Sequence, residues 1–238
     1  MAKNRIKPPE EGAPFNPVEE VIYSRRSVRF YKKEQVPERL VMRVLEAGRF
    51  APSAGNAQPW KFIVFQDRAV IDEMENDVID FCKKIKKFAD YIEPGQGKKA
   101  WRAKMIMRAM PNNFHPTPFG AMKLMAEGKL GVWHGAPTVI AILVDKRAPG
   151  KPMLDAGIAG QNMVLAAHSM GLATCWVSFI TPLQFQLKWR KRLGLRYPYK
   201  LASSIALGFP KGTPDGVVSR EKQAIDWYGE DGTMKVVY

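Results

Sequence analysis

The sequence predicts an α+β fold in a single domain, residues 16–238, with an insertion, and two observations support this. Segments with apolar residues at helical spacing alternate with short β-branched runs, in an order that mixes helices and strands. No Gly-x-x-x-x-Gly-Lys-Ser/Thr or Gly-x-Gly-x-x-Gly pattern follows a predicted strand, which disfavours the P-loop and Rossmann folds. A chain of 238 residues is also long enough to bury a substantial core.

The first predicted helix is recognised by its start. Asn16, Pro17 and Glu19 provide a capping residue, a proline at the first helical position and a glutamate at the third, which together satisfy exposed backbone amides. We expect this helix to run to about Arg26. The preceding residues, 1–15, are polar and proline-rich and are expected to form an extended arm ahead of the domain.

The next elements follow the spacing of apolar residues. Residues 37–50 and 67–87 have helical periodicity, and residues 61–65 between them are predicted to form a strand. Residues 86–134 are irregular, with turn signals on both sides of one helical segment, 101–110. We interpret residues 86–134 as an insertion or lid that covers a site.

The C-terminal half is predicted to alternate strands and helices. Residues 138–144 are a β-branched strand, and residues 155–170 form a helix rich in small residues that should be central and buried. Residues 172–180 are expected to be a strand, and 181–184 a capping box that opens a basic helix. A last strand is predicted over residues 201–207.

Composition narrows the class of protein. With 46% hydrophobic and 25% charged residues the chain falls in the ordinary globular range. Its longest apolar stretch is far below the roughly 20 residues of a membrane span, and its first residues lack the apolar core of a secretory signal, so we expect a cytoplasmic protein with no membrane segment. Cys82 and Cys175 have no metal-like spacing and are expected to be buried thiols.

The net charge of +14 favours anionic partners: a phosphorylated cofactor, nucleic acid or acidic lipid. Much of the excess lies in residues 83–108, which we interpret as a solvated face or a substrate-entry rim. A basic nucleic-acid-binding protein is the alternative from another class, and it is disfavoured because no nucleic-acid-binding motif is present.

Two motifs carry the functional argument. Residues 24–29, Ser-Arg-Arg-Ser-Val-Arg, combine guanidinium groups, which bind phosphate in a bidentate manner, with hydroxyl donors. A basic run that complements a helix dipole is the alternative. In residues 51–60, Gly55 permits a tight turn while Ser53, Asn56 and Gln58 offer the mixed donors and acceptors that a heteroaromatic ring edge needs. An ordinary turn between prolines would look the same.

In this order the two motifs resemble those of the nitroreductase family: Arg-Arg-Ser-x-Arg, followed about two dozen residues later by Pro-Ser-x-x-Asn-x-Gln-Pro-Trp. Residues 161–162, 171–176 and 206–210 continue the resemblance, which covers roughly residues 18–222 apart from the insertion. The resemblance implies a three-layer sandwich whose central mixed, mainly antiparallel sheet is flanked by helices, in a domain-swapped homodimer with FMN at its interface.

The resemblance also implies roles for individual residues. Arg25 and Ser27, with Arg26, would hold the FMN phosphate, and Arg29 would lie near the pyrimidine edge of the flavin, where a cation stabilises the reduced state. A basic-x-basic pair in the tail would clamp the phosphate, although two solvated charges would give the same pattern. The implied cofactor-binding set is Arg25, Arg26, Ser27, Arg29, Pro52, Ser53, Ala54, Asn56, Gln58, Ser178, Gly208, Arg220 and Lys222.

Four of these residues, Pro52, Ser53, Ala54 and Asn56, would approach the flavin from the neighbouring subunit. The chain departs from the family pattern within the predicted strand, after Trp176, where Ser178 and Phe179 replace a Gly-rich or acidic backbone. The Ser178 amide is expected to face flavin N5. Phe179 either narrows the site or stacks on substrate, or it packs in the core.

The implied activity is that of an oxidoreductase that uses NAD(P)H to reduce nitroaromatic, quinone or related acceptors by ping-pong hydride transfer. The flavin carries the chemistry, and no metal or catalytic side chain is expected. Reductive dehalogenation, flavin cleavage, and flavin binding without turnover remain alternatives. His115 and His134 are candidate proton donors, with a structural role favoured for each. The insertion would supply an apolar cover from Trp101, Met105, Met107, Phe114 and Phe119.

Overall fold

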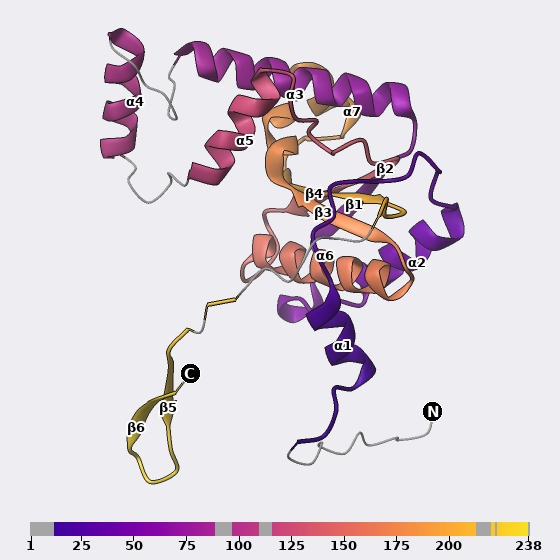
Figure 1. Ribbon diagram of the computed structural model, residues 1–238, viewed down its shortest axis with the longest axis vertical. Coiled ribbons are helices and arrows are strands. Elements are labelled where there is room, and N and C mark those ends of the chain that lie inside the picture. Colours follow the sequence, from indigo (N-terminus) through magenta and orange to yellow (C-terminus); the bar gives the residue numbers. More distant parts are fainter. Residues whose placement is uncertain (1–11, 89–96, 110–115, 213–219, 222, 238) are drawn as a thin grey trace.

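The computed structural model describes residues 12–88, 97–109, 116–212, 220–221 and 223–237 (Figure 1). Within these residues a four-stranded sheet has the order β1 (Trp60–Phe65), β2 (Thr138–Asp145), β4 (Tyr199–Gly208), β3 (Ala173–Val177). All three strand pairings are antiparallel, and one parallel bridge joins Ser27 to Thr174. The sheet is therefore mixed and mainly antiparallel, as predicted.

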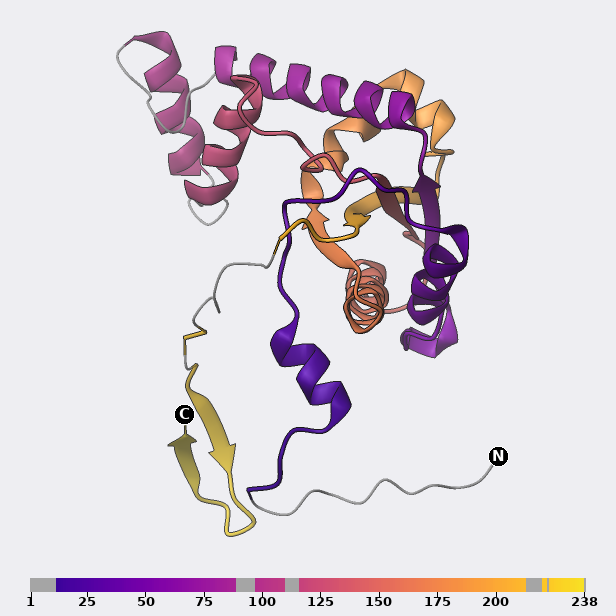
Figure 2. The same ribbon diagram turned by 45° about the vertical axis from the view of Figure 1, so that its right-hand side comes forward.

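Helices cover both faces of this sheet (Figures 1 and 2). The long strand β2 is buried along nearly its whole length, and its alternate side chains enter two separate core clusters. One cluster lies under α2 (Glu38–Arg49) and α6 (Pro152–Ser169); the other lies under α3 (Arg68–Phe88), α5 (Pro116–Ala126), the 3-10 helix η3 (Ser178–Phe185) and α7 (Leu187–Arg192). Three layers result, which confirms the predicted sandwich.

Close packing fixes α6 against the edge strand of the sheet. A Cβ atom at Gly160 would lie 2.2 Å from the Trp176 ring of β3, so only glycine lets this indole lie against the helix. Seven residues on the inner side of α6 are buried, whereas Leu154 and Gln161 on its other side are exposed. The expectation of a buried central helix therefore holds for one face in the single chain.

The N-terminal helix begins as predicted. In α1 (Pro17–Ser24) the Asn16 side chain accepts hydrogen bonds from the Val18 and Glu19 amides, and the Glu19 carboxylate accepts one from the Asn16 amide. The helix ends at Ser24, two residues before the expected end. The arm predicted over residues 1–15 lies outside the described residues except for 12–15.

Two predictions after β3 are wrong. The strand expected over residues 172–180 stops at Val177, and the chain continues as η3, which contains Thr181. Ile180 and Leu183 are spaced by one 3-10 turn and are both fully buried, so packing favours this helix over a longer strand. The predicted capping box therefore does not start the basic helix, because α7 begins only at Leu187.

Within its described residues the insertion has two helices, where one was predicted. The predicted segment is α4 (Lys98–Ala109), and a second helix, α5, starts with Pro116, which suits the first turn of a helix because its missing amide needs no partner there. Residues 89–96 and 110–115 lie outside the described part. A hairpin of β5 (Ile225–Tyr228) and β6 (Met234–Val237), not predicted from the sequence, projects from the body in both views (Figures 1 and 2).

The two cysteines are buried free thiols, as expected. Within the described ranges, no helix combines the length and the apolar character needed to cross a membrane.

Candidate functional site

The segment that follows α1 carries the first predicted motif along the edge of the sheet. The Val28 amide donates to the Thr174 carbonyl at 2.9 Å, and the Lys32 amide donates to the Phe209 carbonyl at 2.9 Å. The Tyr31 hydroxyl donates to the Val28 carbonyl at 2.7 Å and stiffens the turn between these two anchors. This segment and β3 contribute residues to two cavities.

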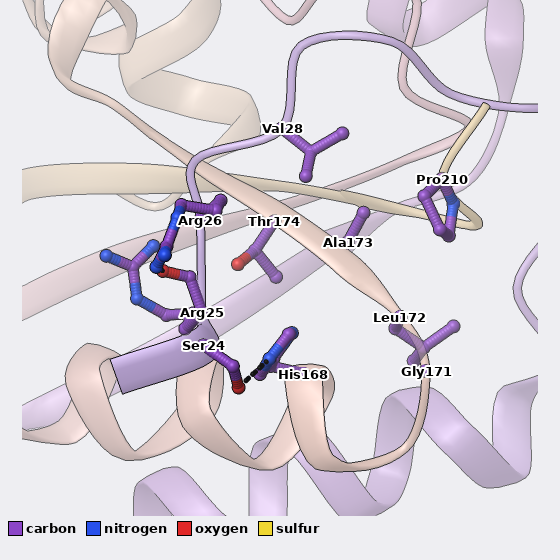
Figure 3. A pocket seen from close by; sticks show the side chains of 10 residues that line it. All are labelled: Ser24, Arg25, Arg26, Val28, His168, Gly171, Leu172, Ala173, Thr174 and Pro210. Carbon is purple, nitrogen blue, oxygen red and sulfur yellow. Dashed lines mark hydrogen bonds between the residues drawn. The ribbon is translucent and has the colours of Figure 1, made fainter. Parts of the chain in front are cut away.

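The smaller cavity has a volume of about 170 Å³ and lies where α1 ends above α6 (Figure 3). The side chains of Arg25 and Arg26 project beside each other there, and the Ser24 hydroxyl lies 2.8 Å from Nε2 of His168. The lining residues are Ser24, Arg25, Arg26, Val28, His168, Gly171, Leu172, Ala173, Thr174 and Pro210. This volume accommodates a small polar group, since one water occupies about 30 Å³ of liquid.

Positive charge accumulates at this cavity. The pKa of Arg25 is lowered, first by burial and then by the nearby Arg220 and Arg26 guanidinium groups. The pKa of His168 is also lowered by burial and then by Arg25 and Arg26. Among the described residues no carboxylate contributes to either shift, so an anion bound here would relieve the repulsion between the cations.

The two arginines of this cavity differ in the hydrogen bonds that they make within the chain. The Arg26 guanidinium donates to the backbone carbonyls of Tyr23 and Arg25, at 2.6 and 2.8 Å. These bonds hold Arg26 to the end of α1. Arg25 is therefore the better candidate for direct contact with an anion.

The larger cavity has a volume of about 790 Å³, within the range of sites that bind small molecules. Its wall is mostly apolar, and more than half of its residues come from the insertion. The lining residues are Arg29, Pro118, Gly120, Ala121, Leu124, Met125, Leu130, Val132, His134, Cys175, Trp176, Val177, Ser178, Phe179 and Thr181. A flat, largely apolar molecule suits such a wall.

A few polar groups interrupt this apolar wall. Burial and then the Arg29 guanidinium lower the pKa of His134, and burial raises the pKa of the Cys175 thiol. The Ser178 hydroxyl lies 3.4 Å from that of Ser203. Phe179 both lines the cavity and packs against the core.

The second predicted motif lies outside both cavities. Residues 54–56 form a short 3-10 turn, η1 (Ala54–Asn56), in which the Ser53 hydroxyl accepts the Gln58 amide at 2.9 Å. Asn56 and Gln58 are exposed, and both have left-handed backbones with φ of 56° and 46°. No residue from 52 to 58 lines either cavity.

The remaining predicted site residues have varied positions. Ser27 bridges to Thr174 through its backbone and is exposed. Gly208 is buried at the end of β4, where a Cβ atom would lie 2.8 Å from both Tyr31 and Pro137. Lys222, like His115 and Phe114, lies outside the described residues.

The insertion reaches the larger cavity through residues other than those predicted. The predicted residues Trp101, Met105, Met107 and Phe119 do not line it. Other residues of α5 do. Sequence reasoning also overlooked His168 at the smaller cavity. Its position two helical turns after Gln161, one of the residues that carry the resemblance, would have placed it on the same helix face.

Comparisons with known proteins identify the family. A family model described as the nitroreductase family matches residues 22–209. A protein of Methanothermobacter thermautotrophicus, provisionally named NADH dehydrogenase/NAD(P)H nitroreductase, is 28% identical over 199 residues, 82% of this chain and 78% of that protein.

Two solved structures are similar as well. The nitroreductase of Desulfitobacterium hafniense with bound FMN is 25% identical with a TM-score of 0.63, covering 87% of this chain and 96% of that one. Iodotyrosine deiodinase bound to FMN and 3-iodo-L-tyrosine has a TM-score of 0.60 at 20% identity, over 88% of this chain and 98% of that one, and shares the fold.

Proposed function

This chain belongs to the nitroreductase family, and from that premise we propose that it is an FMN-dependent oxidoreductase that uses NAD(P)H to reduce nitroaromatic, quinone or related aromatic acceptors. The observation that carries the proposal is a pair of cavities that are both lined by residues of one segment, 24–29. One is small and cationic and the other is large and mostly apolar.

The residues fit FMN because its two ends need different surroundings. Arg25, supported by Arg220, would bind the phosphate by charge-assisted hydrogen bonds. The larger cavity would receive the ring, with Arg29 and Ser178 on its wall. When bound, FMN would supply the hydride-accepting and hydride-donating centre that amino-acid side chains lack.

The chain's own groups would then orient the flavin and tune its chemistry. The Arg29 cation favours negative charge on a bound group, and the apolar residues of α5 exclude water from it. Because the cavity is a single space, donor and acceptor would occupy it in turn, which is the order of a ping-pong reaction.

We also propose that the site is completed by a second copy of the chain. The turn at residues 52–58 is exposed and self-supported, which suits a segment that binds in another subunit. The outer face of α6 exposes Leu154, and the hairpin β5–β6 exposes Trp227 and Tyr228. Such a two-stranded hairpin is at best marginally stable without a surface to pack on. A homodimer would cover these surfaces.

Reductive dehalogenation is the alternative that a specific observation favours, since the deiodinase shares the fold. Flavin cleavage is distinguished by its outcome, because the bound flavin would be consumed.

The first test is the absorption spectrum of the purified protein, followed by anaerobic addition of NADH or NADPH. We expect flavin absorption that bleaches on addition and returns with a quinone or nitroaromatic acceptor. A protein that stays colourless after incubation with excess FMN contradicts the proposal. Release of halide from a halogenated phenol, without quinone reduction, would favour the dehalogenase alternative.

A further inference from the structure

His134 lies in a loop, residues 132–136, that is fixed on both sides of the histidine. The preceding residue, Trp133, is fully buried, and its indole Nε1 donates to the Ser204 hydroxyl at 3.0 Å. That hydroxyl in turn donates to the Val177 carbonyl at 2.7 Å, at the end of β3. Val177, which forms the floor of the larger cavity, and the loop at residues 132–136 therefore share one buried hydrogen-bond network.

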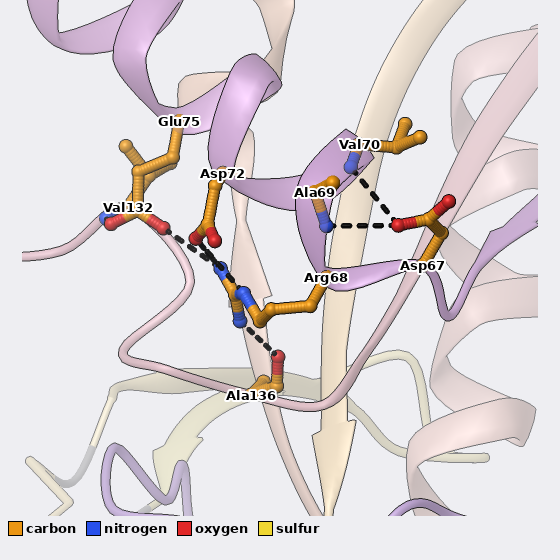
Figure 4. A network of polar contacts seen from close by, with 8 residues as sticks. All are labelled: Asp67, Arg68, Ala69, Val70, Asp72, Glu75, Val132 and Ala136. Carbon is orange, nitrogen blue, oxygen red and sulfur yellow. Dashed lines mark hydrogen bonds and ion pairs between the residues drawn. The ribbon is translucent and has the colours of Figure 1, made fainter.

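A second set of contacts comes from α3 (Figure 4). The Glu75 carboxylate accepts the Val132 amide at 2.8 Å, and Arg68 donates to the Ala136 carbonyl at 3.2 Å. Arg68 also pairs with Glu75 at 3.7 Å. The loop is thus tied to α3 at both ends.

This anchoring matters because the His134 backbone is left-handed, with φ of 54°. Such a conformation is unfavourable for a residue with a Cβ atom and persists only where its surroundings enforce it, typically at functional sites. Asn56, Gln58 and His134 are the only non-glycine residues of the described ranges with positive φ. The other two belong to the predicted flavin-binding turn.

The imidazole has a chemical role available to it. Among the polar groups on the cavity wall, Arg29 would serve the flavin, while burial and then Arg29 lower the pKa of His134 and so favour its neutral form. A neutral imidazole offers one donor and one acceptor. Around it, Leu130, Val132 and Met125 present apolar surface.

We propose that His134 is a specificity-determining residue of this cavity, which selects acceptors that carry an oxygen substituent on an apolar ring by hydrogen bonding to that oxygen. This inference rests on the proposed function, since it takes the cavity to be the acceptor site. Quinones, nitroaromatics and halogenated phenols share the required oxygen substituent, and hydrocarbons of the same shape lack it.

The test compares two redox-inert ligands of similar shape, acetophenone and cumene, binding to the oxidised FMN-loaded protein. His134→Gly removes the imidazole while relieving the left-handed strain, and His134→Asn keeps a donor and an acceptor and tolerates this backbone. We expect His134→Gly to weaken acetophenone binding by up to about tenfold and to leave cumene binding unchanged, with His134→Asn in between. Equal losses for both ligands, or none, would overturn the proposal.

A measurement on the unaltered protein guards against misfolded variants. The chain has three histidines, so ¹⁵N-histidine spectra can be assigned with the variants or by selective replacement. Acetophenone should shift the His134 ring nitrogens, and cumene should not. The flavin spectrum and its bleaching by NAD(P)H are recorded in parallel: their absence in the unaltered protein refutes the proposed function, whereas their presence with an unshifted His134 refutes this inference alone.

Discussion

The two cavities share one segment and one strand, yet they offer opposite chemistry. At the smaller one, the Arg26 and Arg220 guanidinium groups lie close enough to lower the pKa of Arg25, whereas at the larger one apolar residues of the insertion dominate. The cationic end is built from the sheet edge and helix ends of the sandwich itself, and the apolar end is built largely from the insertion. On the proposed function, phosphate binding and acceptor choice can therefore change separately.

The largest expected effect is at the cationic end. Arg25→Ala should weaken FMN binding by about 30- to 150-fold, because a hydrogen bond between charged groups contributes roughly 2–3 kcal/mol. Arg26→Ala is the matched control and should lose less, since its guanidinium already binds two backbone carbonyls. Titration of the apoprotein with FMN, followed by flavin fluorescence, measures both. Equal losses would remove the distinction drawn between these arginines.

The next effect concerns the floor of the larger cavity. Ser204→Ala leaves the buried Trp133 indole and the Val177 carbonyl without their hydroxyl partner and should lower the free energy of unfolding by about 1–2 kcal/mol. Ser203→Ala, which loses only a long contact to Ser178, should cost less. Urea denaturation of the two variants compares them. A larger loss for Ser203→Ala would show that the network does not hold the floor.

A smaller effect is expected on redox properties. Arg29→Gln removes the cation that would face the reduced flavin and should lower its reduction potential by roughly 20 mV, or about 1 kcal/mol for two electrons. Arg29→Lys keeps the charge and should retain the potential more closely. Spectroelectrochemical titration measures these values. An unchanged potential in Arg29→Gln would mean that this residue does not tune the flavin.

The smallest effect involves the tie between α3 and the end of α5. Glu127 pairs with Lys86 at 2.7 Å and Lys129 at 3.0 Å, and hydrogen bonds from these lysines lower its pKa from 4.5 to about 2. When folding lowers the pKa of a carboxyl group, the group stabilises the fold at pH values above its pKa in the unfolded chain. For Glu127 this contribution is present above about pH 4.5 and disappears as the pH falls towards 2.

Glu127→Gln should therefore melt slightly lower than the unaltered protein at pH 7, and the difference should vanish on acidification. Thermal unfolding of both proteins at several pH values measures this. FMN affinity should stay unchanged, since Glu127 lies at neither cavity. A difference that grows in acid would contradict the assignment of this ion pair.

The features that could be predicted from sequence are those that local residues determine. Helix starts such as Asn16 and Pro17, and the β-branched run of β2, are encoded locally, so the sandwich and its cationic segment were accessible. The end of β3 at Val177 was not, because the burial of Ile180 and Leu183 decides it. The role of Pro52, Ser53, Ala54 and Asn56 across subunits stays a prediction, because it depends on a second chain and not on local sequence.

Left-handed backbone at Asn56, Gln58 and His134 also sets how these positions tolerate mutation. Glycine adopts this conformation without strain, so replacing any of the three should preserve or raise thermal stability. If the side chains serve the flavin and the acceptor, the same replacements should lower activity. A mutational scan read out separately for abundance and for turnover would then rank glycine near the top at these positions in the first screen and near the bottom in the second.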